Sequence, residues 1–154
     1  MIIRKAKIKD LDQIVKLALD FAKYHHKFDP YFAYKSDISK IYRENFIKSI
    51  YSTKRLLLVA QDNNRLVGYC LGSLATRSPI FKIYDIGVIN DAFIDQDYRR
   101  KGLLELFLKE MFKWFKSKKI HDVELFVVAK NEIGKNAWAK YGFEDILLRR
   151  KIRI

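Results

Sequence analysis

Apolar residues along this chain follow two periods, one typical of helices and one typical of strands. Recurrence at three- and four-residue spacing, as in Leu11, Ile14 and Ala18, predicts amphipathic helices. Short runs rich in leucine, β-branched and aromatic residues predict strands. By these criteria the helices span residues 11–21, 38–50, 103–118 and 131–141, and the strands span residues 2–7, 55–61, 65–75, 84–95, 121–129 and 143–154.

Polar residues and turn formers mark the boundaries of these elements. Asp10 precedes the first helix and the pair Ser36-Asp37 precedes the second, in each case as an N-cap residue does. Asn63-Asn64 predicts a tight turn between two strands, because asparagine tolerates left-handed backbone. The aromatic segment 28–37 contains Pro30, so we predict a loop there rather than a continuation of the first helix.

The predicted order is β-α-α-β-β-β-α-β-α-β, a mixed α/β arrangement in which helices cover a central sheet. The helix over 103–118 connects two strands by a crossover, which predicts that those two strands are parallel. A length of 154 residues suits one domain, and 49% hydrophobic residues can supply its core. With only 6 glycines and 2 prolines no linker is evident, so we predict a single domain over residues 1–154.

The chain is strongly basic, with 31 Lys and Arg against 18 Asp and Glu and a formal net charge of +13. Such a balance favours anionic partners, such as nucleotides or nucleic acid. A solvated lysine-rich surface would give the same composition. Composition alone therefore leaves both readings open.

Several classes of protein are disfavoured by composition. The single cysteine, Cys70, permits no internal disulfide, and with three histidines we expect no metal site. The N-terminal stretch is charged within four residues, unlike a signal peptide, and no apolar run approaches the length of a membrane span. We therefore expect a cytoplasmic protein without membrane contact.

One stretch, DYRRKGLLELFLKEMFKWF from Asp97, places three cations directly before a strong apolar helix. A helix N-terminus already carries partial positive charge and unpaired N–H groups, so cations there predict a bound anion. The stretch lacks the Gly-Lys-Ser/Thr ending of a Walker loop and the glycines of a dinucleotide fingerprint. It fits R-x-x-G-x-x after a strand, in which successive backbone N–H groups can cradle a pyrophosphate.

In this context the chain resembles the GCN5-related N-acetyltransferase (GNAT) family over nearly its whole length. RLVGYCLG from Arg65 is similar to the third strand of the family, and DAFIDQDYRRKGLL from Asp91 is similar to the fourth strand with its pyrophosphate loop. NEIGKNAWAKYGFED from Asn131 is similar to the late helix and its Gly-Phe exit. The resemblance implies a GNAT-like fold whose fourth and fifth strands splay apart, with acetyl-CoA bound between them.

The resemblance also implies roles for individual residues. Backbone groups of Phe93 and Ile94 would contact the pantetheine arm and thioester, and Asn131 would contact CoA as well as cap its helix. The pyrophosphate would be wrapped by six consecutive residues: Arg99, Arg100, Lys101, Gly102, Leu103 and Leu104.

Two positions depart from the pattern of the family. Leu104 stands where a second glycine or alanine is usual. Trp138 stands where many members keep a tyrosine that protonates the departing CoA thiolate, and tryptophan cannot act as that acid. We expect Trp138 to pack, against pantetheine or the acceptor. Tyr141 is near in sequence but on another part of the helix, so another group, or water, would supply the proton.

An amine must be neutral to attack a thioester, so a base is also expected. Asp91 is the best candidate because it enters the CoA site two residues before Phe93; Asp85 and Tyr84 are weaker alternatives. Phe126 stands where some members have a glutamate in the fifth strand, so that version of the base is absent.

These observations predict an acetyl-CoA-dependent N-acetyltransferase that acetylates a primary amine, of a small molecule or a protein, by direct attack in a ternary complex. The basic charge leaves open an RNA- or aminoacyl-tRNA-directed acetyltransferase, or a ribosomal partner. A catalytically weak module that binds CoA or nucleic acid is a further alternative. The terminal RRKIRI has an edge-strand pattern, so a homodimer is also open.

Overall fold

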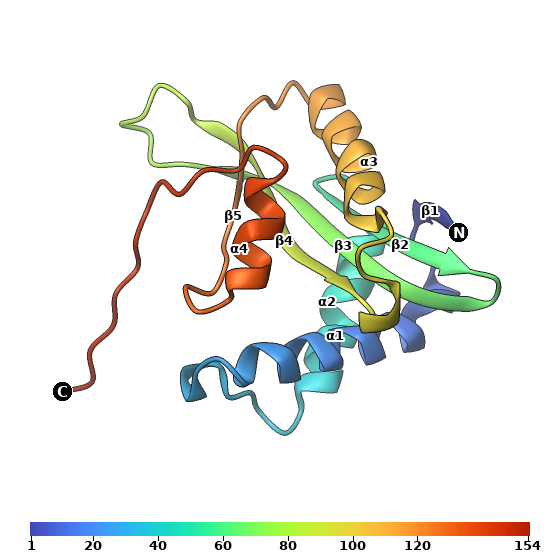
Figure 1. Ribbon diagram of the computed structural model, residues 1–154. Helices are drawn as coiled ribbons and strands as arrows, with labels where there is room; N and C mark the ends of the chain where they lie inside the picture. Colours follow the sequence, from blue (N-terminus) through green and yellow to red (C-terminus); the bar gives the residue numbers. More distant parts are fainter.

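The computed structural model describes all 154 residues and shows a five-stranded sheet flanked by helices (Figure 1). The strand order is β1-β2-β3-β4-β5, and neighbours are antiparallel except β4 and β5, which are parallel. The mixed α/β class and the predicted parallel pair are thus confirmed. The elements are β1 (Ile2–Lys5), α1 (Leu11–His26), α2 (Ile38–Tyr51), β2 (Arg55–Asp62), β3 (Arg65–Thr76), β4 (Asp85–Ile94), α3 (Leu103–Ser117), β5 (Val123–Leu125) and α4 (Glu132–Ala139), with 3-10 turns η1 (Ile8–Asp10), η2 (Pro30–Phe32) and η3 (Gln96–Tyr98).

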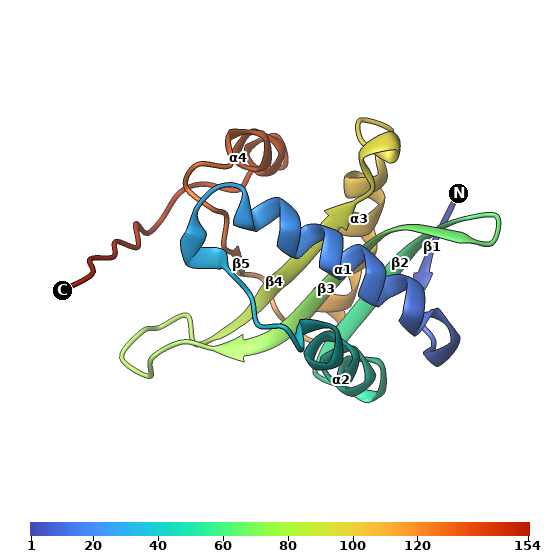
Figure 2. The ribbon, with the colours of Figure 1, turned by 90° about the horizontal axis from the view of Figure 1, so that it is seen from below.

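Helices cover both faces of the sheet (Figure 2). On one face α1 and α2 enclose a core cluster that includes Phe46 and Tyr69. On the other face α3 encloses a second cluster around Phe107 and Met111, against which Trp138 of α4 also packs. Strands β2 and β3 are buried on both sides, which explains why their sequences read as nearly continuous apolar runs. None of the helices is both long and apolar enough to cross a membrane.

A glycine in β4 determines how closely α3 approaches the sheet. A Cβ atom on Gly87 would lie 2.5 Å from a ring carbon of Phe115 on α3, a separation that real side chains do not tolerate. Phe115 is 1% exposed and fills the space that the missing side chain leaves. This contact brings the C-terminal part of α3 close against β4.

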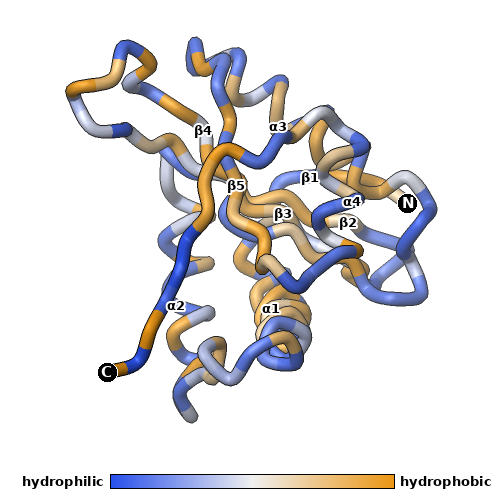
Figure 3. The backbone as a smooth tube through the Cα atoms, turned by 60° about the vertical axis from the view of Figure 1, so that its left-hand side comes forward, coloured by the Kyte–Doolittle hydropathy of each residue, from blue (hydrophilic) through white to orange (hydrophobic).

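Two predicted strands differ from the structure. The strand over 121–129 is reduced to Val123–Leu125, because the chain turns away from β4 after three paired residues. The strand over 143–154 does not form: the chain is irregular from Phe143 onward, and Ile146 and Ile152 are 76% and 89% exposed. The alternation of isoleucine and cations is real (Figure 3), but β5 is too short to template another strand.

Asp10 has a different role from the predicted helix cap. It stands before α1 but makes no capping hydrogen bond to that helix. Its carboxylate instead accepts from Arg4, at 2.7 and 2.8 Å, and from the backbone N–H of Lys7 at 2.8 Å. Asp10 is 4% exposed, and the hydrogen bonds from Arg4 are the main reason that its pKa lies below the ordinary value. The pair ties β1 to the start of α1.

We expect Asp10→Ala to lower the free energy of unfolding at pH 7 by about 3 kcal/mol, because the change leaves the guanidinium of Arg4 partly buried without its partner. A lowered carboxyl pKa stabilises the fold above its ordinary value of 3.8, and this contribution is lost as the pH falls through the folded-state value. Urea denaturation curves at pH 7 and pH 3 measure the loss of unfolding free energy and its dependence on pH. Asp12→Ala is the control, since that side chain is 85% exposed; equal losses in the two variants would contradict the expectation.

Candidate active site

The β4–β5 pair opens part of the way along its length. The two strands are paired from Gly87 opposite Val123 to Ile89 opposite Leu125, where β5 ends. β4 continues to Ile94 with only β3 as a neighbour, while the chain after β5 leads to α4 (Figure 1). The splayed fourth and fifth strands are therefore confirmed. One edge of β4, including Phe93 and Ile94, is left without a paired strand.

A β-bulge in β4 determines which face carries the candidate base. Leu71 pairs with Asp91 and Gly72 pairs with Ile89, so Asn90 is the extra, unpaired residue. The insertion reverses the alternation of side chains beyond it. Asp91 and Phe93 consequently lie on the face opposite to Ile89: Phe93 packs in the cluster beneath α1 and α2, whereas Ile89 packs in the cluster beneath α3. The sequence offered the carboxylate but no signal for the bulge that orients it.

Asp91 lies in an apolar environment that favours its neutral form. The carboxylate has no ion pair and no hydrogen bond from another side chain, and burial raises its pKa to about 6. Burial, and next the charge of Asp91, raise the pKa of Tyr42 to about 12 and the pKa of Tyr69 well above its ordinary value. The hydroxyl of Tyr69 is buried without a hydrogen-bond partner. A carboxylate of this kind can accept a proton near neutral pH.

The loop after β4 presents a row of free backbone N–H groups. Arg100 and Gly102 both have left-handed backbone, with φ of 60° and 77°. From Arg100 to Glu105 no backbone N–H donates to an acceptor within the chain, because these residues precede or begin α3. A Cβ on Gly102 would meet no atom within 4 Å, so conformation rather than space requires glycine there. The arrangement is suited to binding an anion.

The three cations of this loop point in different directions. Arg100 and Lys101 are exposed, and the ammonium of Lys101 lies 4.9 Å from the ring centre of Tyr98. Arg99 turns back toward β4: its Nε donates to the carbonyl of Ile94 at 3.0 Å, and its guanidinium lies 5.8 Å from the ring centre of Phe93. The predicted basic cluster is therefore divided between the α3 N-terminus and the end of β4.

The two leucines that follow Gly102 belong to the core. Leu103 is 1% exposed, and Leu104 is partly buried against the same cluster beneath α3. The side chain of Leu104 therefore packs away from the free N–H groups. Its backbone amide remains part of the row, so a leucine at this position is compatible with an anion-binding loop.

Asn131 and Trp138 occupy opposite ends of α4. Asn131 is 7% exposed, and its Oδ1 accepts from the N–H of Gly134 at 2.9 Å, which confirms the predicted cap. The same oxygen accepts from the hydroxyl of Tyr24 at 3.1 Å. Trp138 packs edge-on against Phe143, with ring centres 5.5 Å apart, on the α3 side. Sequence reasoning missed Tyr24, because no local pattern links the end of α1 to α4.

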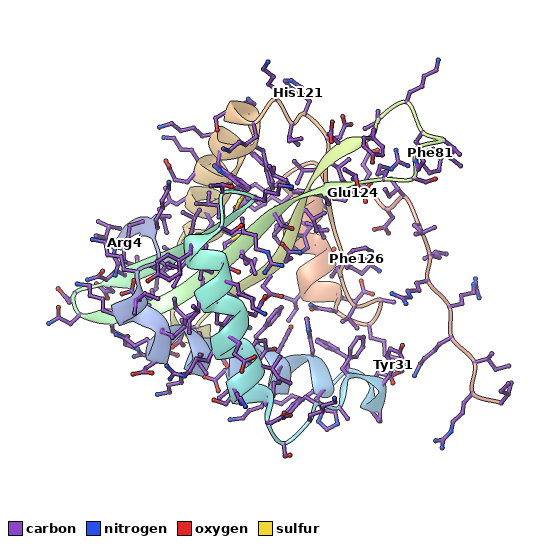
Figure 4. The ribbon with its side chains drawn as sticks, turned by 180° about the vertical axis from the view of Figure 1, so that it is seen from behind. Arg4, Tyr31, Phe81, His121, Glu124 and Phe126 are labelled. Atoms are coloured by element: carbon purple, nitrogen blue, oxygen red, sulfur yellow. The ribbon has the colours of Figure 1, made fainter.

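The remaining candidates lie at the rim of the site. Asp85 and Tyr84 are exposed at the start of β4, away from the bulge. Phe126 is 80% exposed just after β5 (Figure 4). Tyr31 of the aromatic loop is 65% exposed, so this part of the loop lies at the surface. No cluster of three or more metal-ligating side chains occurs in the chain.

Similarity to known proteins agrees with this geometry. The model of the acetyltransferase (GNAT) family matches residues 14–143. A spermidine N(1)-acetyltransferase of Thermoplasma acidophilum is 27% identical over 148 residues, covering 92% of this chain and 87% of the relative.

Solved structures share the fold. A tetramutant of the BH1408 protein of Bacillus halodurans superposes with a TM-score of 0.89 at 20% identity, with both chains fully covered. An aminoglycoside 6'-N-acetyltransferase of Acinetobacter haemolyticus gives 0.77 at 14% identity, covering 99% of this chain and 100% of the other. A predicted acetyltransferase of Clostridium acetobutylicum, solved with acetyl-CoA, gives 0.76 at 19% identity, covering 99% and 95%.

The family match extends from within α1 to Phe143, four residues beyond the end of α4. It includes the bulged strand, the opening between β4 and β5, and the loop from Arg100 to Gly102 with its free N–H groups, here called the anion loop. Acetyl-CoA is the acetyl donor of this family. The chain therefore belongs to the acetyltransferase (GNAT) family.

Proposed function

We propose that this protein transfers the acetyl group of acetyl-CoA to a primary amine by direct attack in a ternary complex. The observation that carries the proposal is the loop from Arg100 to Gly102, whose free N–H groups adjoin the open edge of β4. CoA has the complementary form, because a pyrophosphate precedes a long arm with amide groups. The loop would bind the pyrophosphate, and the edge of β4 would bind the arm.

The residues around the opening divide the binding of CoA among them. The amides from Arg100 to Leu104 would hold the pyrophosphate, with Arg100 and Lys101 adding positive charge. Phe93 and Ile94 would offer backbone groups to the pantetheine arm, in place of the strand that β5 no longer provides. The side-chain N–H groups of Asn131 donate to no acceptor in the protein, so they are available to a pantetheine carbonyl.

Asp91 would prepare the acceptor. An ammonium group that enters near the bulge gives one proton to the carboxylate, and the neutral nitrogen attacks the thioester carbon. A backbone N–H near Ile94 stabilises the resulting oxyanion. An acetylated cysteine is not part of the scheme, because Cys70 is fully buried and burial raises the pKa of its thiol.

The acceptor would approach past the aromatic loop of η2. The relative from Thermoplasma suggests an aliphatic polyamine, but little acidic charge is free to bind a polycation here. Asp29, at the start of η2, is already paired with Lys151 at 2.9 Å and Lys130 at 3.6 Å. The net charge of +13 favours an amine whose remaining groups are neutral or anionic, such as a protein amine or an aminoacyl-tRNA.

Calorimetric titration with acetyl-CoA at low and moderate salt tests the cofactor site. We expect saturable one-to-one binding that weakens as salt increases, because phosphate contacts are partly electrostatic. An amine panel follows: spermidine, lysine-containing peptides with acidic neighbours, and an aminoacyl-tRNA. Absence of acetyl-CoA binding would reject the proposal. Binding without turnover on any amine would leave a CoA-binding module, the alternative that Trp138 and Leu104 favour.

A further inference from the structure

The departing CoA thiolate needs a proton, and α4 does not supply the hydroxyl that would give it. Trp138 occupies the corresponding position, where its ring packs against Phe143 at 5.5 Å and against the core beneath α3. An indole N–H is not an acid at physiological pH. A hydroxyl from another element must therefore lie near the thioester if the protonation is catalysed by the protein.

Tyr24 brings such a hydroxyl from the last turns of α1. Its O–H donates to Oδ1 of Asn131 at 3.1 Å, across 107 residues of sequence, so the end of α1 lies against the start of α4 (Figure 2). The ring is held edge-on by Phe28 at 5.0 Å. The hydroxyl is thus fixed beside the residue that we assign to the pantetheine arm.

Arg99 connects this hydroxyl to the end of β4. Its guanidinium lies 5.3 Å from the ring centre of Tyr24 and 5.8 Å from that of Phe93, while its Nε donates to the carbonyl of Ile94 at 3.0 Å. Tyr24, Asn131 and the open edge of β4 therefore meet at one point. A cation in this position stabilises the negative charge that a tyrosine acquires when it gives up its proton.

We propose that Tyr24 is the acid that protonates the departing thiolate, an assignment that rests on the proposed function. When the tetrahedral intermediate collapses, the carbon–sulfur bond breaks and its electron pair goes to sulfur. Sulfur takes the proton of the Tyr24 hydroxyl, which leaves a phenolate beside Arg99. The attacking nitrogen loses its second proton to solvent as the amide forms, and Asp91 releases to solvent the proton that it took from the ammonium. Solvent returns one proton to the phenolate, so that one proton is released in each turnover.

Other charged groups near Tyr24 are few. On α1, the ring centres of Tyr24 and its neighbour His25 lie 6.2 Å apart, and burial lowers the pKa of the His25 imidazole. Lys130 and Asp29 form a pair at 3.6 Å that bridges the same two parts of the chain. Arg99 approaches from the loop after β4. An alkaline limb that vanishes with the Tyr24 hydroxyl consequently belongs to Tyr24 and not to these groups.

The test is Tyr24→Phe, which keeps the ring contacts with Phe28 and Arg99 and removes only the hydroxyl. We expect kcat to fall by about 10²-fold or more, KM for acetyl-CoA to stay within about threefold, and the alkaline limb of the kcat–pH profile to disappear. Tyr51→Phe is the matched control, since that ring is 73% exposed at the end of α2. Melting temperatures verify that both variants fold.

A purely structural link between α1 and α4 would change the melting temperature or KM but leave the alkaline limb in place. A kcat within threefold of the wild type, or an unchanged alkaline limb, overturns the assignment while the proposed function stands. A wild-type protein that binds acetyl-CoA but acetylates no amine overturns both.

Discussion

Replacing Gly102 by valine should abolish acetyl-CoA binding, with Kd rising by at least about 100-fold. Gly102 has φ of 77°, a left-handed conformation that costs a β-branched residue roughly 1–3 kcal/mol. No neighbouring atom holds a side chain in place there, so the backbone is free to relax toward negative φ. Relaxation would turn the N–H groups that precede α3 away from their common focus. Several charge-assisted hydrogen bonds to one pyrophosphate would be lost together.

Gly142→Val is a matched control for this change. Gly142 also has a left-handed backbone, with φ of 85°, and a Cβ there would also meet no atom within 4 Å. It follows α4 and lies outside the anion loop. Titration calorimetry should show wild-type affinity for Gly142→Val, and circular dichroism melts should show similar losses of stability in the two variants. Unchanged affinity in Gly102→Val would remove the loop from the CoA site.

Replacing Asp91 by asparagine should lower kcat/KM for the amine by about 10²- to 10⁴-fold, because the variant cannot accept the ammonium proton. In the wild type the rate should increase with pH through the pKa of about 6, since only the ionised carboxylate acts as a base. The variant should lack this acidic limb. Asp85→Asn, at the exposed start of the same strand, should keep both the rate and the limb. A wild-type acidic limb in the Asp91 variant would exclude Asp91 as the base.

The same substitution should stabilise the protein. A carboxyl whose pKa is higher in the folded chain than in the unfolded chain opposes folding when it is ionised. The difference between about 6 and the ordinary 3.8 corresponds to at most about 3 kcal/mol, fully present above pH 6 and absent below 3.8. Asp91→Asn should therefore melt higher than the wild type at pH 8, and the advantage should vanish near pH 4. Equal melting temperatures at pH 8 would show that the carboxylate is solvated.

The candidate site combines backbone strain, burial of a carboxylate and an unpaired polar group. Asp91 is ionised at a cost, Tyr69 has a hydroxyl without a partner, and Arg100 adopts a left-handed backbone. Such departures from local rules concentrate where a protein acts on a ligand. The two core clusters on either side of the sheet provide the stability that offsets them.

Two parts of this protein could be predicted from local sequence for the same physical reason. Helical spacing defined α2 and α3 closely, because burying one face of a helix imposes a period that survives in any context. The anion loop could be recognised equally well. A glycine and several cations between a strand and a helix are a local signal of a site that binds an anion. The family resemblance rested on this loop and on the order of elements around it.

The remaining features depend on contacts between distant segments. The bulge at Asn90 is defined only by pairing with β3, and it turns Asp91 toward the face beneath α1 and α2. The length of β5 depends on where the chain leaves β4, so the alternating pattern of the C-terminal segment was an insufficient guide to strand formation. Tyr24 and Asn131 are brought together by the packing of α1 against the start of α4. The sequence by itself determined the helices, most of the strands and the loop before α3, whose causes are local. The tertiary structure decided which face carries Asp91, how deeply Asp91 is buried and where the hydroxyl of Tyr24 lies, because these features depend on register and packing between segments far apart in the chain.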